Sequence, residues 1–295
     1  MNPLSVPNDP SSNAASKAAG RVLMINKDAV EGARLEASLA EQNCRLEYAA
    51  GSADALQHLR SRAYDVVITD PTTSIEEDLA LLSEMRAIRP GTRVIVLAPS
   101  STPEEVIAAL RAKVFLCKSA PFDTEEIAEY AARAAASRDA HWGIEVLSAH
   151  RDWLSVRADC RVLTAERLMS FVNELQTELP PSPREDLMTA LREVLMNAIE
   201  HGARFATDKV LEMTAIHTAR ARVLYVHDPG AGFRWEGIPH SALSNPQGEP
   251  GKHLEVREQQ GMRAGGFGIL VARGVVDELI YSEIGNEVLL IKYLA

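Results

Sequence analysis

The sequence predicts an α/β protein, in which a doubly wound, parallel sheet of five strands is followed by a second unit of α+β type. Between residues 21 and 135, five short apolar runs alternate with amphipathic stretches, as in the βα units of a parallel sheet. The 295 residues exceed one typical core, and this length favours about two domains. Apolar residues make up 46% and charged residues 24% of the chain, which indicates folded globular domains.

Five runs rich in β-branched and aliphatic residues predict the strands of the first unit: Arg21–Ile25, Arg45–Ala49, Val66–Thr69, Arg93–Leu97 and Val114–Cys117. The stretches between and after them predict five helices, marked by the following residues: Asp28–Glu41, Ser52 with Leu56 and Leu59, Leu79 with Leu82 and Met85, Thr102-Pro103, and Asp123 with Glu126.

Three of these helices have sequence signals at their N-termini. Ser52 and Thr102 are expected to cap their helices, and Pro103 suits the first helical position. Asp123 and Glu126 have the spacing of a capping box. In a doubly wound sheet the functional residues lie at the C-terminal ends of the strands, so Asp70 and Lys118 become candidates.

The residues at those strand ends resemble the receiver domain of bacterial response regulators over roughly residues 20 to 135. Val66–Asp70 is similar to the third strand of that family, with Asp70 at the phosphoacceptor position. Lys118, followed by Pro121-Phe122, is similar to the Lys-Pro-Phe loop with two extra residues, and Phe115 matches its aromatic switch residue. The resemblance implies a phosphorylatable receiver.

At other positions this sequence differs from the receiver pattern, and these differences favour a second interpretation. Where the family has two adjacent carboxylates for Mg²⁺, this chain has Asn26 and Lys27, with Asp28 next. A fixed ammonium repels Mg²⁺, which prefers oxygen ligands. Ala98 replaces the expected hydroxyl residue, with Ser100 nearby. The alternative is therefore a pseudo-receiver that serves as a docking module, in which Lys27 and Lys118 neutralise Asp70.

The domain boundaries predicted from these patterns divide the chain into four parts. Residues 1–20 form a flexible tail rich in Ser, Asn, Ala and Pro, and residues 21–135 form the receiver-like domain. A linker is expected at 136–149 and the second domain at 150–295. His141 lies in this linker. No pair of long helices surrounds it, so we interpret it as part of an interdomain connection and not as a phosphoacceptor.

A long helix is predicted at Arg184–His201 in the second domain. Its apolar residues Leu187, Leu191, Leu195 and Ala198 share one face. Glu193, Asn197, Glu200 and His201 follow at i, i+4, i+7 and i+8 and form a polar stripe on another face. Such a stripe is either solvated surface or the wall of a site.

Glycine-rich segments follow this helix in a regular order. The strands Val210–His217 and Ala221–His227 lead into Asp228-x-Gly230-x-Gly232, which offers a carboxylate acceptor and close backbone approach. A loop of some thirty residues has the length of a lid. It ends in Gly265-Gly266-Phe267-Gly268 before the apolar helix Ile269–Val275, as in a phosphate cradle. Strands Glu278–Ser282 and Glu287–Leu294 flank a Gly285-Asn286 turn.

Together these motifs resemble the GHKL superfamily of ATP-binding domains over residues 150 to 295. Glu193-x-x-x-Asn197 matches its N box, and the Asp228 and Gly265–Gly268 segments match its two glycine boxes. Within the superfamily the chain is similar to the anti-sigma-factor serine kinases of bacterial partner switches, through 197–202, 276–278 and 285–288. The resemblance implies an α+β sandwich of the Bergerat type.

The resemblance also implies a role for each matching position. Asn197 would hold Mg²⁺ between the ATP phosphates, Asp228 would accept a hydrogen bond from the adenine amine, and Glu193 would be the catalytic base toward a serine or threonine hydroxyl. The glycines would shape the loops around ATP: Gly230, Gly232, Gly265, Gly266 and Gly268. Arg263 is a candidate phosphate contact or a solvated residue, and His201 either supports Glu193 or is structural.

Composition limits the classes of function. A net charge of −10 argues against direct nucleic-acid binding, and no apolar run reaches the roughly 18 residues that a membrane span needs. The three cysteines are scattered, so we expect a reducing cytoplasm and no disulfide framework.

We therefore expect a cytoplasmic, ATP-dependent protein serine/threonine kinase that acts on a protein partner, such as a sigma factor or an anti-sigma antagonist. Its receiver-like domain would gate this activity, and a homodimer is an open alternative. A non-catalytic ATP-binding interaction module with a pseudo-receiver is the second hypothesis.

Overall fold

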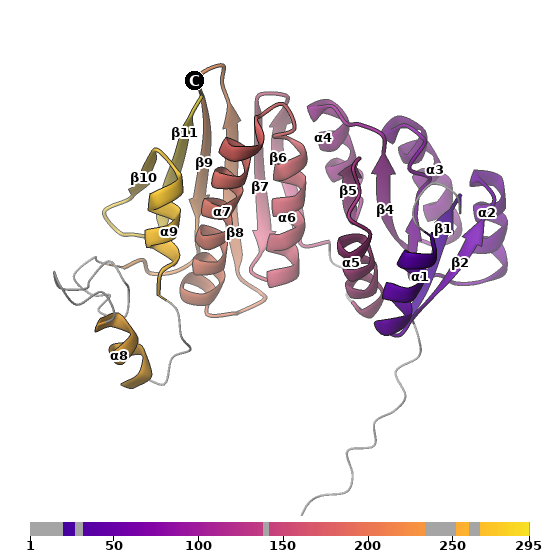
Figure 1. The fold of residues 1–295 in the computed structure, drawn as a ribbon, viewed down its shortest axis with the longest axis horizontal. Coiled ribbons are helices and arrows are strands. Elements are labelled where there is room, and N and C mark those ends of the chain that lie inside the picture. Colours follow the sequence, from indigo (N-terminus) through magenta and orange to yellow (C-terminus); the bar gives the residue numbers. More distant parts are fainter. Residues whose placement is uncertain (1–19, 27–31, 138–141, 234–251, 260–265, 295) are drawn as a thin grey trace, which may run out of the picture.

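The computed structural model describes residues 20–26, 32–137, 142–233, 252–259 and 266–294, and these residues form two sheets that lie side by side (Figure 1). The predicted tail and His141 lie outside the described residues, as do Lys27 and Asp28. No helix in the described part of the chain is long and apolar enough to cross a bilayer.

The first sheet has five parallel strands in the order β2-β1-β3-β4-β5. Its strands are β1 (Gly20–Ile25), β2 (Cys44–Ala49), β3 (Val66–Ile68), β4 (Arg93–Ala98) and β5 (Leu116–Ser119). Its helices are α1 (Gly32–Glu41), α2 (Ser52–Ser61), α3 (Ile75–Ile88), α4 (Pro103–Arg111) and α5 (Thr124–Ala136). The prediction of a doubly wound parallel sheet is confirmed, with strand ends shifted by one or two residues at most positions.

Both faces of this sheet are buried, which explains why its strands are continuous apolar runs. On β1, Val22 and Met24 belong to the cluster formed with α1 and α5, and Leu23 and Ile25 belong to the cluster formed with α2, α3 and α4. These side chains alternate because successive residues of a strand point to opposite faces.

The helix caps agree with the sequence at Thr102 and Asp123 and differ at Ser52. Thr102 and Glu105 form a full capping box. The Asp123 carboxylate accepts from the backbone N–H groups of Glu125 and Glu126. The predicted return bond from Glu126 is replaced by an ion pair with Lys118 at 2.9 Å. Ser52 is the first helical residue, since Gly51 occupies the cap position.

The second sheet is antiparallel, with strand order β10-β11-β9-β8-β7-β6. Its strands are β6 (Ile144–His150), β7 (Trp153–Asp159), β8 (Val210–His217), β9 (Ala221–His227), β10 (Glu278–Tyr281) and β11 (Glu287–Tyr293). Strands β8 to β11 begin at the predicted residues. The β6–β7 hairpin was not predicted, and β6 occupies part of the range 136–149 that the sequence assigns to a linker.

Helices α6 (Val162–Glu174), α7 (Pro181–Asn197) and α9 (Gly268–Val275) cover one face of this sheet (Figure 1). The sequence did not predict α6. The predicted helix Arg184–His201 begins earlier, at Pro181, and its α-helical period ends at Asn197, where a π-helical turn spans Ala198–Ala203. Helix α8 (Lys252–Gln259) lies within the segment expected to be a long loop, away from the sheet in Figure 1.

Asp78 is a buried carboxylate on α3, beneath the C-terminal end of β3. Its two oxygens accept hydrogen bonds from Thr69 Oγ1 at 2.6 Å and Thr73 Oγ1 at 2.8 Å. Burial raises the pKa of Asp78 from 3.8 to about 6, and these hydrogen bonds oppose the shift. The raised pKa means that the folded chain binds the proton more tightly than the unfolded chain does.

We predict that Asp78→Asn changes the pH dependence of stability. Protonated Asp78 contributes to the stability of the folded wild type, and this contribution is lost as the pH rises through about 6. The unfolding free energy of the variant minus that of the wild type should therefore increase by roughly 2–3 kcal/mol between pH 4 and pH 7. Urea unfolding across this range measures the difference. Glu76→Gln, at an exposed position of the same helix, is the control, and a pH-independent difference for Asp78→Asn would contradict the prediction.

Candidate functional site

A hollow of about 570 Å³ opens between the end of α7, the start of α9 and the strands β9, β10 and β11. The structure brings most of the predicted site residues together around it. Those that line it are Asn197, Asp228, Gly230, Gly232, Gly266 and Gly268. Gly265 and Arg263 lie outside the described residues.

Helix α7 carries Asn197 to the wall of this hollow, whereas Glu193, one helical turn earlier, is not among the residues that line it. Both side chains are half-buried and lie beside Gly268, the first residue of α9. A methyl group on Gly268 would lie 2.5 Å from Glu193 Oε2 and 3.7 Å from Asn197 Nδ2. Neither side chain has a hydrogen-bond partner among the described residues, so both are available to a ligand.

Asp228 follows β9 and is anchored by its backbone. Its N–H donates to the carbonyl of Asn286 at 2.9 Å, and its Oδ1 accepts from the N–H of Gly230 at 2.7 Å. Its Oδ2 has no partner among the described residues. Burial raises the pKa of this carboxyl, and the Gly230 N–H acts in the opposite direction. One carboxylate oxygen is therefore fixed, and the other is left as an acceptor beside the hollow.

Two pairs of glycines allow the loops around the hollow to touch. A methyl group on Gly230 would lie 2.7 Å from the Cα of Gly202 and 3.1 Å from its carbonyl oxygen. Gly232 and Gly285 both have positive φ angles, of 76° and 86°, and lie against the backbone of Ile284 and Phe233 respectively. A side chain at these positions would separate the loop after β9 from the turn before β11 or from the end of α7.

Several lining residues were not assigned by sequence reasoning. Arg204 and Lys209 line the hollow from the connection between α7 and β8, and they add positive charge to it. Phe233 and Tyr281 also line it and meet edge to face, with ring centroids 5.2 Å apart. Arg204 and Lys209 follow Gly202 within seven residues, a proximity that could have drawn attention to them. The two aromatic residues had no comparable signal.

The π-helical turn changes the predicted polar stripe. His201 still lines the hollow, whereas Glu200 does not. Arg204 and Phe205 end the turn in the left-handed region, with φ of 56° and 58°. Single π turns in α-helices are frequent at functional sites. Here the turn brings the backbone of Gly202 against Gly230.

The predicted phosphoacceptor Asp70 lies at the C-terminal edge of the first sheet. Asn26 Nδ2 donates to its Oδ2 at 3.0 Å, and the N–H and hydroxyl of Thr72 donate to its Oδ1 at 2.9 and 2.7 Å. Lys118 pairs with Glu126 and not with Asp70, which corrects the expectation that Lys118 neutralises this carboxylate. Three neutral donors hold Asp70 in place.

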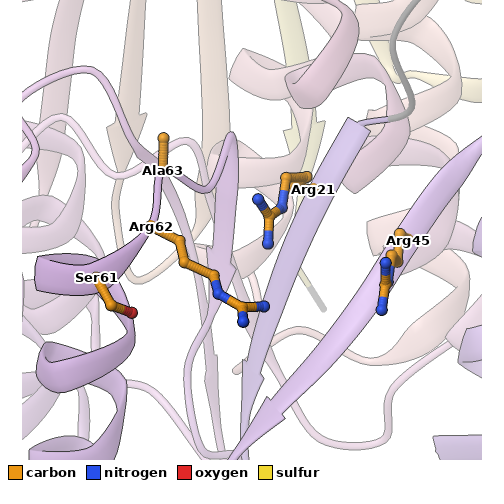
Figure 2. A pocket seen from close by; sticks show the side chains of 5 residues that line it. All are labelled: Arg21, Arg45, Ser61, Arg62 and Ala63. Carbon is orange, nitrogen blue, oxygen red and sulfur yellow. The ribbon is translucent and has the colours of Figure 1, made fainter.

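A second hollow, of about 550 Å³, lies at the opposite edge of the first sheet (Figure 2). Arg21, Arg45 and Arg62 line it, with Ser61 and Ala63. Glu47 lies among the three guanidinium groups, with Arg21 at 2.9 Å and Arg62 at 3.1 Å. The arginines are therefore partly neutralised by a carboxylate of the same sheet, and Arg45 and Arg62 are exposed to solvent.

The N-terminal and C-terminal halves of the chain are similar to different groups of known proteins. The family described as histidine kinase-like ATPase domain matches residues 156–292. The transcriptional regulatory protein ZraR of Salmonella typhimurium is 24% identical over 115 residues, which is 39% of this chain. Those residues are 26% of ZraR, so the chain spans about a quarter of the length of the curated relatives it matches.

Solved structures that are similar to the N-terminal half include receiver domains and response regulators. A CheY-like receiver domain protein from Methanospirillum hungatei is 19% identical, with a TM-score of 0.34 over 39% of this chain and 96% of that one. An orphan response regulator of Helicobacter pylori is 20% identical, with a TM-score of 0.36 over 40% and 98%. Residues 156–292 thus match the histidine kinase-like ATPase family, and the N-terminal half has a doubly wound fold of five parallel strands.

We predict opposite effects for alanine at Gly230 and Gly274. The Gly230→Ala methyl group meets the backbone of Gly202, and overpacking of this kind costs roughly 1–3 kcal/mol. Gly274 lies on α9 with open space around it, so Gly274→Ala should stabilise by about 0.5–1 kcal/mol through helix propensity. Thermal unfolding measures both variants. An equal Tm for Gly230→Ala and the wild type would contradict the close approach of the two loops.

Proposed function

We propose that this chain is a cytoplasmic signalling protein that binds MgATP in the hollow between α7 and α9 and phosphorylates a serine or threonine of a partner protein. The observation that carries the proposal is the convergence of Asn197, Asp228 and two glycine segments on one hollow. The sequence resemblance to anti-sigma-factor kinases favours a partner switch, with a sigma factor or an anti-sigma antagonist as partner.

The residues present fit an adenine base. Asp228 Oδ2 has no hydrogen-bond partner within the described part of the chain, which suits the exocyclic amine of adenine. The floor beside it is apolar, formed by Val226 and Val288, with Ile269 and Tyr281 at the wall. Burial raises the pKa of Tyr281, so its hydroxyl stays neutral and adds no charge next to the base. An apolar slot with one oriented polar group is the usual design of a small-ligand site.

The residues also fit a chelated magnesium triphosphate. The Asn197 side chain has no partner among the described residues, and an amide oxygen is a ligand that Mg²⁺ accepts. Helix α9 begins at Gly268, which lines the hollow, and a helix N-terminus favours phosphate. Arg204 and Lys209 would add two positive charges to the same hollow. MgATP supplies the transferable phosphoryl group and an activated leaving group.

Glu193 is proposed as the general base. Its half-buried carboxylate lies beside Gly268, which lines the hollow and begins α9. The carboxylate would accept the proton of the substrate hydroxyl while the hydroxyl oxygen bonds to the γ-phosphorus and the bond from that phosphorus to the bridging oxygen breaks. The products are the phosphorylated side chain, ADP and a proton that leaves Glu193 for solvent.

A second function is favoured by the contacts of Asp70. Asn26 and Thr72, the donors to its carboxylate within the described part of the chain, are neutral. Lys118 is paired with Glu126, and Ala98 ends β4 without a hydroxyl. These features support a pseudo-receiver that docks or gates without phosphorylation. In this alternative the ATPase domain closes on ATP to bind a partner and transfers no phosphoryl group.

We predict that Asp228→Asn weakens MgATP binding about 10- to 100-fold, because a charge-assisted hydrogen bond to the adenine amine is lost. The new amide can donate to the carbonyl oxygen of guanine, so the preference for ATP over GTP should shrink. Calorimetry with both nucleotides measures this change. Asp152→Asn, at the exposed turn between β6 and β7, is the matched control. In Asn197→Ala, the remaining ATP binding should no longer depend on Mg²⁺. Unchanged ATP affinity in Asp228→Asn would sink the adenine assignment.

We predict that Glu193→Gln lowers protein phosphorylation by about 100-fold or more and leaves the MgATP affinity within about threefold. The assay incubates labelled ATP and the chain with a lysate of the cells that produce it. Glu185→Gln, at an exposed position of α7, should keep full activity. Labelled protein that persists in Glu193→Gln would rule out this base. An unlabelled lysate despite normal MgATP binding would instead favour the binding module.

A further inference from the structure

Helix α6 belongs to the ATPase sheet but also packs on the receiver-like domain. It covers β5, which is the edge strand of the five-stranded sheet. The receiver helix α4 packs on β6 in the same way, and Arg111 of α4 donates to the carbonyl of Ala149 at 3.0 Å. One cluster of buried apolar residues runs from the first sheet into the core of the second. The two domains therefore share a packed interface.

Arg167 fixes α6 to the beginning of β5. This side chain is only 5% exposed. Its Nε donates to the carbonyl of Phe115 at 2.8 Å, and its Nη1 donates to the carbonyl of Trp142 at 2.7 Å. The guanidinium carbon also lies 4.4 Å from the centre of the Phe115 ring. A buried guanidinium needs such partners, since burial without hydrogen bonds costs several kcal/mol.

Glu174 fixes the other end of α6 to the end of β5, two helical turns further on. The residue is 4% exposed, and its Oε2 accepts from the N–H of Ser119 at 3.1 Å, from the Ser119 hydroxyl in a short bond and from the Ser101 hydroxyl at 3.5 Å. Ser101 and Ser119 belong to the C-terminal edge of the first sheet, the edge that also carries Asp70. The carboxylate of Glu174, in the ATPase domain, thus contacts two segments of the receiver-like domain.

The opposite connection of α6 leads to the nucleotide hollow. Asn173, next to Glu174, accepts a hydrogen bond from Arg184 Nε of α7 at 2.8 Å. Apolar residues of α6 and α7 pack in the same core. Asn197 lies thirteen residues after Arg184 on α7, about 20 Å along a rigid helix. Continuous hydrogen bonds and helices therefore link Ser119 to the wall of the hollow.

The contact between Glu174 and Ser119 borders space into which it can open. A hollow of about 640 Å³ lies between the domains here, and Lys118, Ser119, Glu174 and Arg184 are among its lining residues. The partners of Glu174 are neutral hydroxyl and amide donors, which exchange for water at lower cost than an ion pair does. The Glu174 carboxylate would therefore enter this hollow if its bonds to Ser119 were broken.

We propose that α6 couples the receiver-like domain to the nucleotide hollow, and that the Glu174–Ser119 contact is the element that opens and closes. The inference rests on the proposed MgATP site and names how that site is regulated. Coupling between two sites is reciprocal. If closing the Ser119 contact changes the affinity for nucleotide by some factor, nucleotide binding must change the equilibrium constant for closing that contact by the same factor. The Ser119 N–H donates directly to Glu174, and its hydrogen exchange reports the contact.

The test measures hydrogen exchange of peptides that span residues 115–123 in the full chain, with and without saturating MgATP. We expect MgATP to change the exchange rate of the Ser119 region about fivefold or more in the wild type and in Glu178→Gln, an exposed neighbour on the same segment. In Glu174→Gln, the change in exchange rate caused by MgATP should fall below about twofold. The Kd for MgATP should differ from that of the wild type by about the same factor by which this exchange response is reduced. Ser119→Ala removes only the hydroxyl donor and should reduce the response in the same direction if Glu174→Gln fails to fold.

Each outcome decides between the two proposals. MgATP binding with unchanged exchange at residues 115–123 in the wild type overturns the coupling and leaves the proposed function intact. A response that persists in folded Glu174→Gln or Ser119→Ala shows that coupling does not run through this contact, and overturns the inference. If the wild type gives no heat of binding with MgATP, the proposed function fails, and the coupling fails with it.

Discussion

The burial of helix α6 between two sheets is the constraint on which the arrangement of the molecule depends. A helix normally covers one core with one stripe of apolar residues, but α6 also turns polar side chains toward a second domain. Arg167 and Glu174 are almost completely buried there, and each has its hydrogen bonds satisfied by backbone or hydroxyl groups of the receiver-like domain or of the connection to it. Because unpaired buried charges are costly, the hydrogen bonds of Arg167 to Phe115 and Trp142 hold α6 on the first sheet. The position of α7, and of everything it carries, follows from that of α6.

The nucleotide hollow is built mainly from backbone that comes close to backbone. Gly202 touches Gly230, Gly232 lies against Ile284, and Gly268 lies against the carboxylate of Glu193. Side chains at these positions would push the end of α7, the loop after β9 and the start of α9 apart. The polar groups that remain beside the hollow are therefore few and oriented, as in Asp228, whose Oδ1 is held by the Gly230 N–H. Such an arrangement can recognise a flat base at one end and hold phosphates at the other.

In the five-stranded domain, the charged residues Asp70 and Lys118 at the strand ends are engaged by neighbours of the same domain. Asp70 is held by Asn26 and Thr72, and Lys118 is paired with Glu126. Directly below, Asp78 is buried between Thr69 and Thr73, with a pKa raised to about 6 by burial. The same edge of the sheet presents Ser101 and Ser119 to Glu174. In this chain the edge serves a contact within the molecule.

The sequence by itself determined the features that depend on residues close together in the chain. Alternating apolar runs gave the five parallel strands, the Thr102-Pro103 signal gave the start of α4, and the order of the Asn197, Asp228 and Gly268 motifs pointed to one site. Tertiary structure decided the rest, because the contacts concerned join residues far apart in the chain. The β6–β7 hairpin is stable as part of a sheet formed with β8, and the α-helical period of α7 ends at Asn197 where Gly202 meets Gly230. Other features depend on which surfaces come into contact after folding, and no local sequence pattern predicts those contacts. They are the partner of Lys118, the position of Arg204 and Lys209 at the hollow, and the burial of Glu174 against Ser119.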